Sequence, residues 1–174
     1  MKLTADSGRT KTTWLLTTND SKKAYFYTQG INPFHMDEST IESILRNELL
    51  PQFLPYSTEL DTISFYGAGC TPEKSLILKE ILKKVFPNAT SIEVASDMLG
   101  AAKALFGDKP GIACILGTGS NSCLYDGEKI IGSISPMGYI LGDEGSGAVL
   151  GKTFLNSLYK GKHRDFIPTF EAET

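Results

Sequence analysis

Residues 114–152, CILGTGSNSCLYDGEKIIGSISPMGYILGDEGSGAVLGK, contain the two motifs that decide the predicted fold. A turn of Gly, Thr and Ser at 117–121 separates two apolar runs typical of strands, and an acidic, glycine-dense loop follows at 142–147. Glycines let backbone N–H groups approach a ligand, and successive N–H groups form a concavity that suits phosphate. An acidic pair beside phosphate requires a cation or a polar hydroxyl substrate between the like charges. We therefore predict nucleotide-phosphate chemistry with a metal ion.

Composition limits the classes of function. The chain is 41% hydrophobic and 21% charged, as in ordinary globular proteins, and its 174 residues allow one large domain or one domain and part of another. A net charge of −3 without a Lys/Arg cluster predicts no nucleic-acid partner and no membrane surface. No apolar run approaches the ~18 residues of a spanning helix, and the acidic Asp6 comes too early for a signal peptide. Three cysteines without CxxC spacing indicate reduced thiols in a cytoplasmic protein.

The rest of the chain alternates strand and helix patterns. Three strands joined by tight turns, at 3–6, 12–17 and 24–28, predict an antiparallel meander. A capping box at 39–42 opens a helix that Pro51 stops. The expected elements after it are a strand at 62–66, a helix from Thr71-Pro72, a strand at 91–94 and a helix from Ser96-Asp97 to Gly107.

The opening pattern of strand, Gly/Thr/Ser turn, strand, strand and helix recurs from residue 112. The second copy predicts strands at 112–116, 121–125 and 129–134, and a helix at 147–159. The two copies share this pattern with little sequence identity, so the chain predicts one whole α/β domain followed by the start of a second.

Polar and glycine-rich features follow the carboxyl ends of predicted strands, where open α/β sheets bind ligands. Five such features are Asp6 with its turn, 67–69, Asp97, 117–121 and 142–147. Any one of them is ordinary turn chemistry, since Gly, Ser and Thr dominate turns. Their joint occurrence predicts a functional site.

The acidic residues each allow a structural and a catalytic interpretation. Asp97 is either a first-turn or capping acid of its helix, or a general base that takes the proton of a hydroxyl attacking a γ-phosphate. Asp6 is either a hairpin residue or a group that orients Mg²⁺ through water. Asp143 and Glu144 are either acids at a helix N-terminus or ligand contacts.

A near-match to the P-loop pattern GxxxxGK[ST] lies at 146–153, SGAVLGKT. Ser146 stands where the first glycine belongs, and Ala148, Val149 and Leu150 favour a helix over a phosphate loop. We therefore expect no P-loop there.

These motifs resemble those of a known family. Residues 6–12, DSGRTKT, resemble the first phosphate motif of the sugar kinase/Hsp70/actin superfamily, and 116–121, LGTGSN, resembles the second. With 95–97, ASD, and 142–146, GDEGS, they are similar to the BadF/BadG/BcrA/BcrD-type ATPases, in particular the N-acetylglucosamine kinase branch and its bacterial relatives. The resemblance extends from about residue 3 to 158, and the pair GTGSN and GDEGS is its specific part.

The resemblance implies a fold and an activity. The fold is an α/β, ribonuclease-H-like (actin-like ATPase) domain at 1–108, with the beginning of a second, truncated copy at 109–174. The activity is transfer of the γ-phosphate of ATP, with Mg²⁺, to the 6-hydroxyl of N-acetylglucosamine. A small-molecule sugar and ATP are then the partners, while a homodimer and the identity of the sugar are left open.

The resemblance also assigns roles by position. Asp97 would be the catalytic base and a sugar contact, and Asp6 would lie near Mg²⁺. The residues implied around the phosphates are Asp6, Gly8, Thr10, Lys11, Gly117, Thr118, Gly119 and Ser120. The residues implied at the sugar hydroxyls are Asn32, Gly67, Gly69, Asp97 and Asp143.

Two departures from the family pattern leave alternatives open. Arg9 replaces a small residue in the first turn, where it either adds a phosphate contact or crowds the loop. Family members continue beyond residue 174 with their adenosine-binding segment. Whether this chain is a fragment that cannot turn over ATP alone is therefore left open. The other functions we consider are an ATPase that activates a partner enzyme, and a non-catalytic module that senses a sugar or nucleotide.

Overall fold

A computed structural model describes residues 1–54, 56, 60–134, 136–161, 165 and 167. The chain divides into two compact units, Met1–Ala104 and Leu105–Thr174, and each is described by itself below. The last part of the predicted second domain, residues 168–174, lies outside the described residues.

Unit 1 consists of three strands followed by alternating helices and strands, in the predicted order. Its elements are β1 (Lys2–Ser7), β2 (Lys11–Thr17), β3 (Lys23–Gln29), α1 (Glu38–Ile44), η1 (Leu45–Leu49), α2 (Leu50–Phe53), β4 (Thr62–Gly67), α3 (Pro72–Val85), β5 (Ser91–Ser96) and α4 (Asp97–Phe106).

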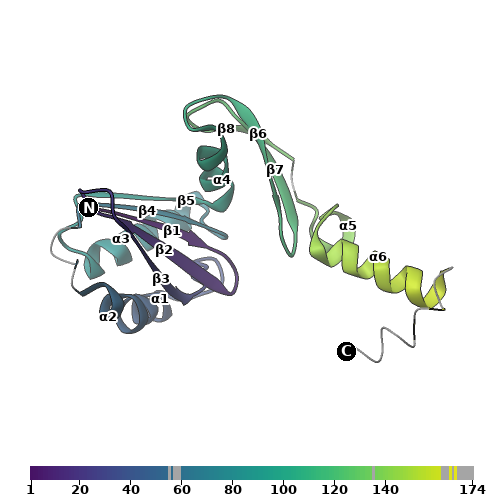
Figure 1. The fold of residues 1–174 in the computed structure, drawn as a ribbon, viewed down its shortest axis with the longest axis horizontal. Coiled ribbons are helices and arrows are strands. Elements are labelled where there is room, and N and C mark those ends of the chain that lie inside the picture. The colour runs from purple at the N-terminus through teal and green to yellow at the C-terminus, as the bar shows by residue number, and fades with distance from the viewer. Residues whose placement is uncertain (55, 57–59, 135, 162–164, 166, 168–174) are drawn as a thin grey trace. The chain divides into compact units, whose positions relative to one another are not determined.

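The five strands of unit 1 form one sheet in the order β3-β2-β1-β4-β5 (Figure 1). The first three strands pair antiparallel, which confirms the predicted meander, and β4 and β5 run parallel to β1. In the parallel register Ser7 lies opposite Gly67, and Gly67 lies opposite Ser96. The carboxyl ends of β1, β4 and β5 therefore lie side by side.

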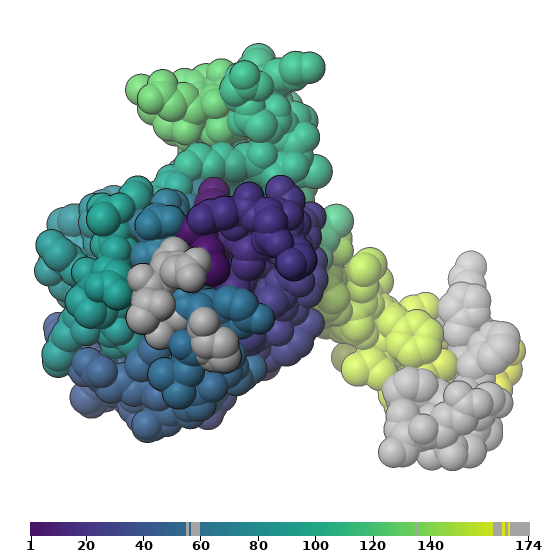
Figure 2. All heavy atoms as spheres, turned by 60° about the vertical axis from the view of Figure 1, so that its left-hand side comes forward, coloured from purple at the N-terminus to yellow at the C-terminus, as the bar shows by residue number. Residues whose placement is uncertain are grey.

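The core of unit 1 lies on the face of the sheet that α1, η1 and α3 cover (Figure 1). Leu3, Ala5, Ile63 and Phe65 alternate along β1 and β4 and are fully buried, as the period of a strand requires. Trp14 packs on Phe65 with ring centroids 5.7 Å apart. The atoms of unit 1, purple to teal in Figure 2, form one continuous body around this core.

Two predictions about the first helix are wrong. The N-cap of the helix is Asp37, not Ser39, because the Asp37 side chain accepts the N–H of Thr40 at 2.7 Å from an extended backbone. Glu42 does not close a capping box; its carboxylate pairs with Arg46 and Lys84 instead.

The helix also continues past Pro51. The turn η1 is π-helical, and the N–H of Leu50 bonds to the carbonyl of Leu45, five residues back. Pro51 then occupies the first turn of α2, where the helix needs no N–H from it. Such a widened turn accommodates a proline that would end a regular helix.

Helix α4 packs on the opposite face of the sheet, over Tyr66. Gly100 lies so close to Tyr66 that a Cβ on Gly100 would stand 2.7 Å from the Cβ of Tyr66. Lys103 of α4 bonds Glu93 of β5 at 2.5 Å and lies over the Tyr66 ring, whose hydroxyl donates to Glu93 at 3.0 Å. These contacts hold α4, and with it Asp97 at its first position, against the sheet.

The charge states of this cluster follow from its contacts. Burial opposes the charge on Glu93, but hydrogen bonds from Lys103 and Tyr66 outweigh it and lower the pKa of the Glu93 carboxyl. Burial and the neighbouring carboxylate raise the pKa of the Tyr66 phenol. Glu93 therefore stays ionised and Tyr66 stays a hydrogen-bond donor at neutral pH.

Unit 2 begins as the predicted second copy does. The strands β6 (Gly111–Leu116), β7 (Ser120–Tyr125) and β8 (Ile130–Ser133) form an antiparallel sheet in that order. The predicted long helix is confirmed as α6 (Gly147–Lys160), whereas the short helix α5 (Gly138–Leu141) was not predicted. None of the described helices is long and apolar enough to cross a membrane.

We predict opposite effects of Gly→Ala at two helical positions. Alanine favours a helix over glycine by about 1 kcal/mol. At Gly151 of α6 no atom lies within 4 Å of the added Cβ, so Gly151→Ala raises the free energy of unfolding. At Gly100 the added Cβ would clash with Cβ and Cγ of Tyr66, so Gly100→Ala lowers the free energy of unfolding by about 1–3 kcal/mol. Urea unfolding measures both, and an equal gain from the two substitutions would contradict the close packing of α4 on Tyr66.

Candidate functional site

Three parallel strands of unit 1 deliver the predicted site residues to one edge of the sheet. β1 ends at Ser7, β4 at Gly67 and β5 at Ser96, in register. The N–H of Ala68 bonds to the carbonyl of Ser7 at 3.2 Å, which extends the alignment by one residue. The first turn, the 67–69 turn and Asp97 therefore leave the sheet next to one another, as the sequence predicts.

The first turn is exposed and closed by its own backbone. The N–H of Gly8 bonds to the carbonyl of Lys11 at 3.0 Å, and Gly8, Arg9, Thr10 and Lys11 are all exposed. The Lys11 ammonium lies 5.1 Å from the ring centre of Tyr27, so at rest it lies over β3. Arg9 is exposed in this turn.

Two buried hydroxyls hold the base of this turn. Ser7 and Thr12 are 1% and 0% exposed, and their hydroxyl oxygens are 2.6 Å apart. The Ser7 hydroxyl donates to the carbonyl of Ile31 and accepts the Ile31 N–H, both at 2.9 Å, while the Thr12 hydroxyl donates to the carbonyl of Gln29 at 3.0 Å. The pair therefore ties the first turn to the end of β3 and to the loop that begins with Asn32.

The turn after β4 lies against Asn32. Gly69 has a φ of +78°, and a Cβ there would stand 2.0 Å from Oδ1 of Asn32. Only glycine satisfies both the left-handed backbone and this close approach. The structure thus brings together Asn32 and Gly69, which are 37 positions apart and were both predicted at the sugar.

Asp97 is the first residue of α4 and is not its cap. Ser96 takes the capping role, because its hydroxyl accepts the N–H of Leu99 at 3.3 Å. Oδ1 of Asp97 accepts the N–H of Met98 at 2.8 Å, and no residue that the structure describes in unit 1 donates to Oδ2. The half-buried carboxylate therefore keeps one oxygen for a ligand.

Cys70 follows Gly69 and lies close enough to Asp97 to sense its charge. The thiol is 8% exposed, and burial, with the negative charge of Asp97, raises its pKa to about 12. Cys70 is therefore a neutral thiol beside the carboxylate at any physiological pH.

In unit 2 the second predicted phosphate loop is attached to the start of α6. The N–H of Gly147 bonds to the carbonyl of Gly117 at 2.8 Å, and the N–H of Ala148 bonds to that of Thr118 at 3.3 Å. Loop carbonyls thus satisfy two of the free N–H groups at the helix N-terminus. The 117–120 turn and the GDEGS loop, far apart in the sequence, meet here.

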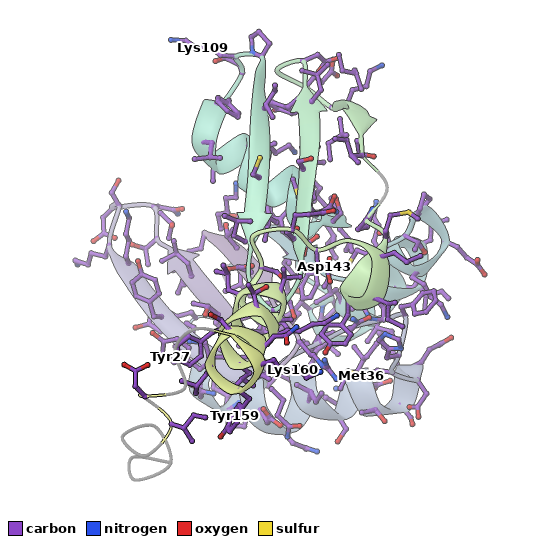
Figure 3. All side chains as sticks on the ribbon, turned by 90° about the vertical axis from the view of Figure 1, so that its right-hand side faces the viewer. Tyr27, Met36, Lys109, Asp143, Tyr159 and Lys160 are labelled. Atoms are coloured by element: carbon purple, nitrogen blue, oxygen red, sulfur yellow. The ribbon has the colours of Figure 1, made fainter. Side chains whose placement is uncertain are left out.

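Asp143 contacts this loop directly and lies before α6 (labelled in Figure 3). Its φ is +61°, an uncommon conformation for a residue other than glycine, and its Oδ1 accepts the N–H of Ser120 at 3.2 Å. A Cβ on Gly119 would stand 3.1 Å from both carboxylate oxygens, a tight approach that would require the Asp143 side chain to shift. The predicted sugar contact Asp143 and the predicted phosphate contacts Gly119 and Ser120 form one cluster.

A pocket of about 280 Å³ opens at this cluster within unit 2. Its polar lining includes Ser120, Asn121, Asp143 and Glu144, and its apolar lining includes Met137. A larger pocket of about 600 Å³ runs along α5 and α6, and Gly142 is the one predicted ligand-loop residue in its lining, beside residues of helix α6. We take the smaller pocket as the candidate site of unit 2 because predicted site residues line it.

The near-match to a P-loop is not a phosphate loop. The hydroxyl of Ser146 caps α6 by accepting the N–H of Val149 at 3.2 Å, and Gly147 already belongs to the helix. The residues that would have to form the loop are helical, as their composition predicts.

No three His, Cys, Asp or Glu side chains among the described residues group closely enough to hold a metal ion. Asp6 is exposed beside the first turn, on the face of the sheet that also carries Tyr66. A lone carboxylate fits Mg²⁺ that arrives with substrate phosphates better than a cage made of protein ligands.

Sequence reasoning missed two contributors to the site, the buried hydroxyls of Ser7 and Thr12. The signal for them is a pair of hydroxyls at strand positions that alternate with buried apolar residues, since a buried hydroxyl requires a partner.

Comparison with known proteins identifies similar solved structures. A candidate N-acetylglucosamine kinase from Porphyromonas gingivalis matches with a TM-score of 0.87 and 50% identity over 98% of this chain and 62% of that chain. A candidate N-acetylglucosamine kinase from Chromobacterium violaceum matches with a TM-score of 0.69 and 21% identity over 93% of this chain and 59% of that chain. The ethanolamine utilization protein EutJ from Carboxydothermus hydrogenoformans matches with a TM-score of 0.54 and 16% identity over 94% of this chain and 58% of that chain. No family model matches the chain, and no curated protein matches it.

These likenesses show the fold. The chain has the actin-like ATPase fold, in which unit 1, with its mixed five-stranded sheet, is consistent with a ribonuclease-H-like domain. The chain spans about 62% of the length of the Porphyromonas protein and 59% of the Chromobacterium protein.

We predict that the buried hydroxyl pair stabilises unit 1. Thr12→Val keeps the shape of the side chain and leaves the groups that bonded to the Thr12 hydroxyl unsatisfied, so the free energy of unfolding falls by about 1–3 kcal/mol. Ser7→Ala has a similar effect, and the double substitution costs less than the sum because the two hydroxyls share one network. Thr13→Val, on the other face of β2, is the control in the same urea unfolding experiment. Additive losses, or an equal loss at Thr13, would contradict the network.

We predict that the three cysteines differ in reactivity. Cys114 is exposed, whereas Cys70 and Cys123 are buried. Because the thiolate is the reactive form, iodoacetamide at pH 8 modifies Cys114 and spares Cys70, whose thiol remains protonated. Peptide mass spectrometry measures the extent of modification, with urea-unfolded protein as the control in which all three react. Modification of Cys70 at the rate of Cys114 would show that its surroundings are open.

Proposed function

We propose that the chain carries the phosphate- and sugar-binding part of an ATP-dependent kinase that phosphorylates N-acetylglucosamine at the 6-hydroxyl. One observation carries the proposal: the parallel ends of β1, β4 and β5 bring the first turn, the 67–69 turn and Asp97 to one edge of a sheet. The 50% identity to a candidate N-acetylglucosamine kinase over nearly the whole chain supports the choice of sugar.

Asp97 is the catalytic base of this proposal. Its Oδ1 is held by the N–H of Met98, which fixes the carboxylate, and Oδ2 remains to accept the proton of the attacking hydroxyl. Asp97 lies in the first turn of α4, where the helix dipole interacts favourably with an acidic side chain. The Cys70 thiol is a neutral neighbour of this carboxylate.

The phosphates of ATP would lie against the two glycine-rich turns. Thr10 and Lys11 offer side-chain donors in the first turn, where Gly8 lets the backbone come close to a phosphate, and Gly117, Thr118, Gly119 and Ser120 form the second turn. Mg²⁺ bound with the phosphates would neutralise charge that develops on the transferred group, with Asp6 orienting it. Lys11 must leave the Tyr27 ring to reach a phosphate, which the flexible lysine stem permits.

Asn32, Gly67, Gly69 and Asp143 would hold the sugar. Gly67 and Gly69 let the sugar approach the backbone at the end of β4, and the Asn32 amide lies against Gly69. A carboxylate such as Asp143 accepts hydrogen bonds from sugar hydroxyls.

The domain boundary is also a proposal. We assign residues 1–108 to a whole ribonuclease-H-like domain and 109–174 to the beginning of a second one. The antiparallel order β6-β7-β8 repeats that of β1-β2-β3. Ile112, Leu116 and Ile140 expose between 67% and 81% of their surfaces, which fits a layer that further structure covers.

Two other functions remain distinguishable. An ATPase that activates a partner enzyme would hydrolyse ATP without sugar, and its relatives use cysteines to bind an iron–sulfur cluster. Cys70 and Cys123 are buried in different units, and no described Cys group forms a metal site. A sensing module would bind sugar without turnover.

We predict that Asp97→Asn abolishes phosphate transfer and leaves the fold intact. Loss of a general base lowers the turnover rate by about 10²–10⁴-fold. The assay follows ADP formation from MgATP with and without N-acetylglucosamine, together with thermal unfolding of each variant. The control is Asp20→Asn, an exposed acid in the turn between β2 and β3 whose loss leaves turnover unchanged.

The outcomes separate the three functions. Sugar-dependent ADP formation that is lost in Asp97→Asn supports the kinase. A rate of ADP formation that is the same with and without sugar supports the ATPase. Thermal stabilisation by sugar without ADP formation supports the sensing module.

A further inference from the structure

An exposed aromatic ring stands beside the predicted sugar contacts in unit 1. The Phe34 side chain is 60% exposed, and its Cβ would lie 3.0 Å from a Cβ on Gly69. Asn32, two residues earlier, lies against the same glycine. Phe34 is therefore at the end of β4, next to residues proposed to hold the sugar.

The backbone fixes Phe34 relative to Asn32. Oδ1 of Asn32 accepts the N–H of Phe34 at 3.0 Å, and the carbonyl of Asn32 accepts the N–H groups of His35 and Met36 at 3.1 and 3.0 Å (Met36 is labelled in Figure 3). The N–H of Asn32 in turn donates to the sulfur of Met36. The loop is a closed turn in which the position of Phe34 follows from that of Asn32.

These bonds also decide which atoms of Asn32 face a ligand. Because Oδ1 is engaged by Phe34, the side-chain group that Asn32 can offer is the Nδ2 amide, for which the described part of the chain shows no hydrogen-bond partner. A donor amide beside an exposed aromatic ring suits a ligand that combines oxygen acceptors with an apolar face. A pyranose sugar has both, since its hydroxyl oxygens lie around a ring whose C–H groups form apolar surface.

We infer that Phe34 is a specificity-determining residue of the sugar subsite, whose ring packs on the C–H face of the pyranose while Asn32 Nδ2 donates to a sugar oxygen. The inference deepens the proposed function and rests on it. The ring lies edge-on to His35, with centroids 5.1 Å apart, so the neighbouring imidazole supports it from one side.

Tyr25, another exposed aromatic residue of unit 1, does not share this setting. Tyr25 is 56% exposed in β3, four residues before that strand ends. At about 3.3 Å per residue it lies roughly 13 Å along the strand from Gln29. Tyr25 therefore provides a matched control, with similar exposure at a distance from the loop.

The test measures sugar binding by the full chain with isothermal titration calorimetry. Phe34→Ala raises the Kd for N-acetylglucosamine roughly three- to tenfold, the range expected for loss of one packed aromatic contact. Phe34→Tyr restores binding to within about twofold because it keeps the ring. Tyr25→Ala leaves the Kd unchanged, and thermal unfolding of Phe34→Ala matches that of the native chain because the ring is exposed.

The inference and the proposed function fail in different ways. An unchanged Kd in Phe34→Ala, with binding by the native chain, would overturn the inference and leave the kinase proposal standing. A raised Kd that Phe34→Tyr does not restore would also overturn it. Absence of binding by the native chain to N-acetylglucosamine, with glucose and mannosamine equally without effect, would contradict the proposed function and the inference together.

Discussion

The parallel register of β1, β4 and β5 is the constraint on which the candidate site of unit 1 depends. It sets Ser7, Gly67 and Ser96 side by side, so that residues far apart in the sequence leave the sheet at one edge. A slip of one residue in either pairing would turn Leu3 or Phe65 out of the core, and burial of these side chains therefore protects the register. The hydrophobic core thus fixes the geometry of the polar edge beside it.

Buried hydrogen bonds extend this order from the strands to the loops. The hydroxyls of Ser7 and Thr12 replace an apolar pair at the end of the core face, where they satisfy the backbone of Ile31. Because these hydroxyls are buried, a loop conformation that left them without hydrogen-bond partners would cost free energy. The network therefore favours a single conformation of the loop. Asn32 continues the chain of contacts to Gly69, so the first turn and the turn after β4 are linked through the same loop.

Periodicity and turn chemistry predicted the meander, the helix of unit 2 and the alignment of Asp97 with the first turn. These patterns failed where the cap or the end of a helix depends on residues that are distant in the sequence or on an unusual helical turn. Glu42 would complete a capping box in isolation, but Lys84 on α3 and Arg46 draw its carboxylate away, and Asp37 caps the helix instead. Pro51 would end a helix by local rules, yet the π-helical turn before it removes the clash. The closeness of Asn32 to Gly69 required the fold itself, because no pattern in the sequence pairs them.

The two glycine-rich turns differ in how they are held, and this difference bears on their roles. The first turn lies at the end of a five-stranded sheet and is anchored by buried hydroxyls, while its residues 8–11 are exposed. The second is a hairpin turn whose carbonyls bond to the start of α6 and whose Ser120 N–H already bonds to Asp143. A ligand phosphate at the second turn would therefore have to compete with the Asp143 carboxylate for a donor. The hydrogen bond between Ser120 and Asp143 thus joins a predicted phosphate contact to a predicted sugar contact within unit 2, so a ligand that engages one of these residues also changes the bonding of the other.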